Sequence, residues 1–199
     1  VTSARFNLLA RQLEAERGPG SDEIRALDKM LLAAFRLELY LDELTALRAR
    51  VGEVVAIGTR AGAPVKEALT AIFDRMERDA PAQFLGGEER KSDFFRDIAG
   101  AAFMHAAERL AGERGLRFEE LTWPFDRAIL DVETELRELD FAATLQRAAR
   151  RVAGPLSEPA RLRLFHVVDH VGTEPIDEIA FSGTGYGRQP LPLPKAAVR

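Results

Sequence analysis

The sequence contains no cysteine in 199 residues. Disulfide bonds, thiolate metal sites and cysteine nucleophiles are therefore excluded for this chain. Long apolar runs are absent too, since none reaches the ~18 to 20 residues that a membrane-spanning helix needs. The first residues, VTSARFNLLARQLEAERG, carry charges throughout and lack the apolar core of a signal peptide. We expect a protein without a membrane span that works in the cytoplasm.

An excess of charge of one sign is also lacking. The 28 Lys and Arg residues are interspersed with 32 Asp and Glu residues, which leaves a net charge of −4. This balance creates no field that would attract nucleic acid, and no short recognition helix stands out, so we expect no nucleic-acid partner. The chain begins with valine, which leaves open that it is a segment of a longer protein.

What the sequence does contain is helical periodicity. The spacing predicts a first helix from residues 2–3 to 16, ended by Gly18-Pro19-Gly20. A long second helix is predicted at 22–50. It is too long for one short neighbour to cover its apolar stripe, and that stripe comprises Leu27, Leu31, Phe35, Leu39, Leu41 and Leu44.

Further caps and breakers predict four helices in the middle of the chain. Pro64 begins one that runs to 79, and Pro81 marks a loop. Gly115 ends the next, at 92–113, with Phe95, Phe103 and Leu110 on its inner side. Thr122 with Pro124 begins a helix to 139, with Trp123 as a core anchor, and a further helix covers 140–152.

Two segments allow a strand as an alternative. Residues 53–58 contain Val54, Val55 and Ile57 between glycines, which suits a short strand or an ordered loop. Residues 162–171 alternate apolar and charged side chains at their start, so a hairpin at 162–181 is possible. Ser157 followed by Pro159 favours a seventh helix at 158–171 instead.

The predicted fold is therefore all-α. It is a single domain of six or seven amphipathic helices at 1–172, followed by an irregular, Pro- and Gly-rich tail at 173–199.

The segment RLFHVVDHVG, residues 163–172, holds the strongest candidates for a chemical site. His166 and His170 lie one helical turn apart, so both could offer an imidazole nitrogen to one metal ion. Asp169, however, points about 100° away, and Arg163 lies on the histidine side, where its charge opposes a cation. We therefore predict the polar edge of an amphipathic helix and no metal site.

Two weaker candidates lie elsewhere. His105 and Glu108 form an H-x-x-E pair that would face one way on a helix, but it reverses the order used in di-iron bundles and occurs once. The segment FSGTGYGRQ contains three glycines and Arg188, which could bind an anion. No helix pattern follows it, so a flexible linker is the favoured interpretation.

These observations favour a helical protein–protein interaction or assembly subunit without catalytic activity or cofactor. We expect it to bind a protein partner, or itself, through the long helix. The alternative is an enzyme or small-ligand-binding protein with an inter-helix pocket that uses the histidines and carboxylates.

Overall fold

A computed structural model describes residues 2–15, 17–58, 62–86, 95–135 and 141–173. Within these ranges the chain forms eight α-helices and no strand, so the all-α prediction is confirmed. Their bounds are α1 Thr2–Ala15, α2 Ser21–Ala26, α3 Asp28–Gly58, α4 Ala63–Leu85, α5 Phe95–Arg114, α6 Phe118–Glu135, α7 Phe141–Val152 and α8 Glu158–Thr173. None of the described helices is both long and apolar enough to cross a bilayer.

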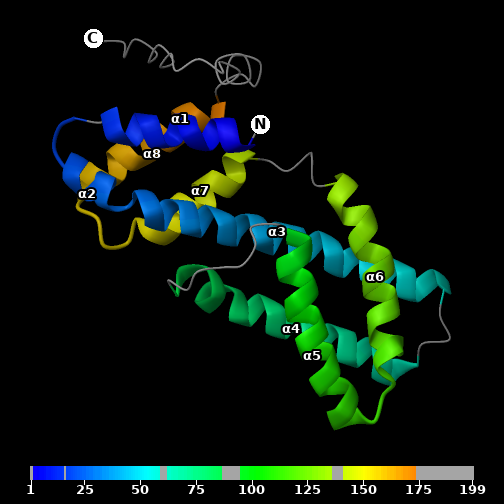
Figure 1. The fold of residues 1–199 in the computed structure, drawn as a ribbon. Helices are drawn as coiled ribbons and strands as arrows, with labels where there is room; N and C mark the ends of the chain where they lie inside the picture. The colour runs from blue at the N-terminus through cyan, green and yellow to red at the C-terminus, as the bar shows by residue number, and fades with distance from the viewer. Residues whose placement is uncertain (1, 16, 59–61, 87–94, 136–140, 174–199) are drawn as a thin grey trace. The chain divides into compact units, whose positions relative to one another are not determined.

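The contacts within the chain group into two units. The first comprises residues 1–35 and 140–199, and the second comprises residues 36–139. In the first unit α8 packs against α1, α2 and α7. In the second unit α4, α5 and α6 gather against residues 36–58 of α3 (Figure 1). The predicted tail at 173–199 lies almost wholly outside the described residues.

The predicted helix at 22–50 is divided and displaced. Leu27 interrupts it in a turn, with its backbone N–H bonded to Ile24, and the long helix proper is α3, 31 residues from Asp28 to Gly58. Ile24, Leu27 and Leu31 are all buried, so the turn lets α2 and the start of α3 both bury apolar side chains. This division accounts for the eighth helix.

The strand or loop predicted at 53–58 is wrong, because α3 continues through it to Gly58. Val51 and Val55 are buried one turn apart, which is helical spacing. Gly52 costs the helix only about 1 kcal/mol, an amount that such packing offsets. The helix predicted at 158–171 is confirmed by α8, which excludes the strand alternative for residues 162–173.

Two prolines lie inside helices that we predicted to end or begin there. Pro81 lies within α4, which continues to Leu85, and Pro124 lies within α6, which begins six residues earlier at Phe118. A proline in a helix interior removes one backbone hydrogen bond and costs about 3 kcal/mol. Burial of Phe84 after Pro81, and of Leu121 and Phe125 on either side of Pro124, opposes that loss.

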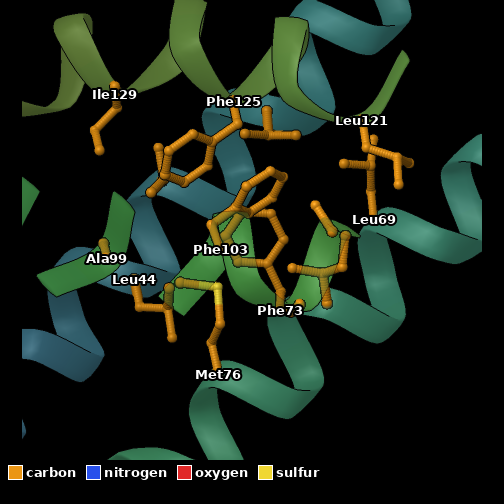
Figure 2. Close-up of a cluster of buried hydrophobic side chains, with 14 of the residues drawn as sticks. Leu44, Leu69, Phe73, Met76, Ala99, Phe103, Leu121, Phe125 and Ile129 are labelled. Carbon is orange, nitrogen blue, oxygen red and sulfur yellow. The ribbon is translucent and has the colours of Figure 1, made fainter. Parts of the chain in front are cut away.

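The core of the second unit is an aromatic cluster. The rings of Phe103 on α5 and Phe125 on α6 stack with centroids 3.9 Å apart, and Phe73 of α4 lies 6.0 Å from Phe103 (Figure 2). Leu44 of α3 and Met76 of α4 reach the same cluster. The predicted inner side of the 92–113 helix is confirmed for Phe103 and Leu110, which are buried.

The apolar stripe of the long helix is covered by the chain itself. Leu27, Leu31 and Phe35 are buried, and the Phe35 ring contacts Phe141 of α7 within the first unit. Leu44 is buried in the second unit, while Leu39 and Leu41 are half-buried. The uncovered surface on which the predicted long-helix interface depended is therefore largely absent.

Candidate functional site

The histidine segment lies on α8 and presents its two imidazoles differently. His166 is exposed, whereas His170 is half-buried and its Nε2 atom is shielded from solvent. Asp169 is exposed and accepts a hydrogen bond from the Gln146 amide of α7. Its carboxylate thus takes part in the contact between α7 and α8, and it does not form one site with the two histidines.

The other candidate residues belong to other parts of the chain. His105 and Glu108 are both exposed on α5, in the second unit, and the histidine segment is in the first. Among the described residues no three histidine, aspartate or glutamate side chains are grouped so as to hold a metal ion. Arg188 and the FSGTGYGRQ segment lie outside the described residues.

An apolar face that the sequence did not predict lies on α6. Trp123 and Leu130 are each 51% exposed, seven residues apart on the same side of the helix, with exposed Arg127 between them. We call Trp123, Arg127 and Leu130 the α6 face. The prediction that Trp123 anchors the core is wrong, because the opposite side of α6, with Leu121 and Phe125, faces the cluster in Figure 2.

The start of α6 explains why Trp123 was misplaced. Glu120 accepts a hydrogen bond from the Arg117 backbone N–H at 3.3 Å and pairs with the Arg117 guanidinium at 3.0 Å. The Glu120 carboxylate thus accepts the backbone N–H of the residue that precedes the helix, which is one half of a capping box, and the helix begins after residue 117, not at Thr122. From Phe118 onward the 3.6-residue period puts 121, 125 and 128 inward and 123 outward. Recognition of Glu120 as a capping residue would have revealed this.

A pocket of about 340 Å³ lies between α3 and α4 in the second unit. Val51 and Val55 of α3 and Leu69 and Phe73 of α4, all of them buried residues, form its apolar lining. Gly52 and Ala56, one turn apart on α3, also line it, and their small side chains leave the space open. The glycine–alanine spacing is visible in the sequence, but the second helix that faces it becomes apparent only in the fold.

The charges at this pocket are basic. Arg48 lines it, but its guanidinium is paired with Asp74 of α4 at 2.8 Å and lies 3.9 Å from Glu77. Lys66 of α4 also lines it, and within the described part of the chain its ammonium forms no ion pair. None of the predicted site histidines or carboxylates lines the pocket.

Comparison with known proteins gives one partial likeness. The chain is 34% identical over 158 residues to the phosphoribosylformylglycinamidine synthase subunit PurL of Cereibacter sphaeroides (strain KD131 / KCTC 12085). The match covers 71% of this chain but 22% of that protein. No known family profile matches the chain, and no solved structure matches it significantly.

Proposed function

We propose that this chain is a helical protein–protein interaction or assembly subunit, without catalytic activity of its own, and that it acts in the cytoplasm. The observation that carries the proposal is the α6 face. A tryptophan and a leucine project from one exposed side of a helix whose other side is fixed in an aromatic core.

Tryptophan and arginine are the residues most enriched among those that dominate binding energy at protein interfaces. A fully buried tryptophan removes about 150 to 250 Å² from water. Because Trp123 is still 51% exposed, a partner that covered it would bury about half of such an area. The rigid attachment of α6, through Phe125 stacked on Phe103, supports this role because an ordered anchor loses little entropy on binding.

The proposed interface is on α6, whereas the sequence led us to expect an interface on the long helix. The stripe of the long helix is mostly buried within the chain, whereas Trp123 and Leu130 of the α6 face each keep 51% of their surface exposed. We therefore assign the contact with a protein partner, or with a second copy, to α6.

The relative that the chain resembles is, by its name, a subunit of a synthase, and so a part of a larger assembly. This agrees with an assembly role for the present chain. The synthase activity belongs to the whole relative, and the match covers about a fifth of its length.

The test uses a photo-reactive amino acid at position 127, between the two apolar side chains, in cells that express the full chain. We expect a discrete covalent adduct, with a second copy or with one other protein, that is lost when Trp123 and Leu130 are both changed to alanine. The matched control places the same cross-linker at position 158, which is exposed on α8. An adduct pattern at 127 that equals the control, or that persists in the double variant, would overturn the proposal.

A further inference from the structure

The pocket between α3 and α4 has the composition of a small-ligand site. Pockets that hold small molecules usually measure about 300 to 1,000 Å³ and combine an apolar lining with a few polar groups. This one, at about 340 Å³, lies at the small end of that range. Its charged lining residues are the cations Arg48 and Lys66. No aspartate or glutamate of the described chain lines the pocket.

Of its two cations, one is already neutralised. Asp74, 2.8 Å from the Arg48 guanidinium, compensates that charge within the protein. Lys66 has no such partner among the described residues, and its helical neighbours three and four positions away are Gly62, Ala63, Leu69 and Thr70, none of them acidic. Among the described residues, the pocket therefore offers one uncompensated positive charge beside an apolar lining.

We propose that this pocket binds a small amphipathic carboxylate, with its hydrocarbon part against Val51, Val55 and Phe73 and its carboxylate at the Lys66 ammonium. One free cation suits a single negative charge better than a polyanion, because further charges would stay unpaired. The volume corresponds to about eleven groups of water size, at ~30 Å³ each. Octanoate has about that size.

The site is independent of the proposed interaction surface, because it lies on α3 and α4 and the α6 face lies on α6. Loss of one function would leave the other intact. The relevant measurement is therefore direct binding, which does not depend on a protein partner.

The experiment is isothermal titration calorimetry of the full chain with sodium octanoate at constant pH and ionic strength. We expect saturable binding that weakens about three- to fivefold in Lys66→Gln, as expected for an exposed charge pair. Lys29→Gln, a change of another exposed lysine that does not line the pocket, should bind octanoate as the wild type does. Octanol, which lacks the charge, should bind the wild type and Lys66→Gln equally.

A second variant reduces the volume of the pocket. A Cβ atom at Gly52 would meet nothing within 4 Å, so Gly52→Leu can place its side chain in the open space. Replacing a helical glycine also favours the helix, so the melting temperature should be unchanged or higher while octanoate binding becomes weaker.

Four results would overturn the proposal. The first is no saturable binding of octanoate by the wild type. The second is unchanged binding in a folded Gly52→Leu variant, which would place the ligand elsewhere. The third is an equal effect of Lys66→Gln on octanoate and octanol. The fourth is binding of octyl phosphate more than tenfold tighter than octanoate, which would assign the pocket to a different anion.

Discussion

Glu23 accepts two hydrogen bonds from Ser157, one from the backbone N–H and one from the hydroxyl group, each 2.8 Å long. The two residues are 134 positions apart, and their contact joins α2 to the residue before α8. Ser157 directly precedes α8, at the position of a helix cap. Its carbonyl does accept the first helical bond, from Arg161, but its hydroxyl is used between helices.

The first prediction follows from this contact. The backbone hydrogen bond from Ser157, and then the hydroxyl one, lower the pKa of Glu23 below its ordinary value of 4.5. A lowered folded-state pKa stabilises the protein above the unfolded value, and this stability is lost as the pH falls through the folded value. We expect Glu23→Ala to lower the melting temperature at neutral pH, and the difference from wild type to shrink below about pH 4.

Thermal melting of wild type and variant between pH 3 and 7 checks this prediction. Glu14→Ala, which removes an exposed carboxylate from α1, is the control and should change the melting temperature little at any pH. A deficit in Glu23→Ala that is constant across the pH range would show that the ionised form has no special role.

The second prediction concerns the aromatic cluster. Phe103 is fully buried between Phe73 and Phe125, so Phe103→Ala should lower the free energy of unfolding by about 3 to 5 kcal/mol. Met104→Ala, at its exposed neighbour, should stay within about 0.5 kcal/mol. Urea denaturation measures both. Equal losses for the two variants would mean that this part of α5 is placed with the wrong side inward.

The all-α class was predictable because apolar side chains repeat with helical spacing over most of the chain, as Val65, Leu69, Ile72 and Met76 of α4 illustrate. Helix ends at glycine were also predictable, because they depend on the local backbone conformation. Gly115 follows α5 with φ +64°, a conformation that other residues rarely adopt.

What the sequence could not show depends on tertiary packing. Whether a helix passes through Pro81 or Gly52 is decided by contacts with other helices, and local preference argues against both. The pocket between α3 and α4 could not be predicted for a related reason. His105 and His166 attract notice by residue type, whereas the α3–α4 pocket arises from Gly52 and Ala56 facing a second helix, a juxtaposition that only the fold creates.

The third prediction concerns Tyr40, whose ring is buried against Phe84 and Phe95. Within the described residues its hydroxyl has no hydrogen-bond partner. Because an unsatisfied buried hydroxyl costs about 1 to 3 kcal/mol, Tyr40→Phe should raise the free energy of unfolding by about 1 kcal/mol. Chemical denaturation at pH 7 checks this, and a loss of stability would indicate that the hydroxyl is hydrogen-bonded in solution.

The same residue gives a pH dependence. Burial, and then the nearby Glu43 carboxylate, raise the pKa of Tyr40. A raised folded-state pKa means that the stability is fully present below the unfolded value of about 10 and is lost as the pH rises further. Wild type should therefore lose stability above pH 10 relative to Tyr40→Phe.

The fourth prediction returns to α8. Zinc should not raise the melting temperature of the wild type, because exposed His166 and half-buried His170 are not joined by a third ligand among the described residues. His166→Gln should change stability by less than about 0.5 kcal/mol. Stabilisation by ~2 kcal/mol or more at micromolar zinc, absent from that variant, would establish a metal site.

The last prediction tests the packing of α2 on α8. Gly20 precedes α2 with φ +80°, and a Cβ atom there would lie 2.7 Å from the Cα, Cβ and N atoms of Ala160. The left-handed conformation alone costs a non-glycine residue about 1 to 2 kcal/mol, and the contact is with backbone that cannot rotate away. Gly20→Ala should therefore lower the free energy of unfolding by more than about 2 kcal/mol.

Gly112→Ala is the matched control, because Gly112 lies inside α5 and a Cβ atom there would meet nothing within 4 Å. It should stabilise the protein by about 0.5 to 1 kcal/mol, since alanine favours the helix over glycine. The same substitution thus has opposite signs at the two positions, and urea denaturation of both variants measures them. If Gly20→Ala were as stable as Gly112→Ala, α2 and α8 could not approach each other as closely in solution as Gly20 and Ala160 do here.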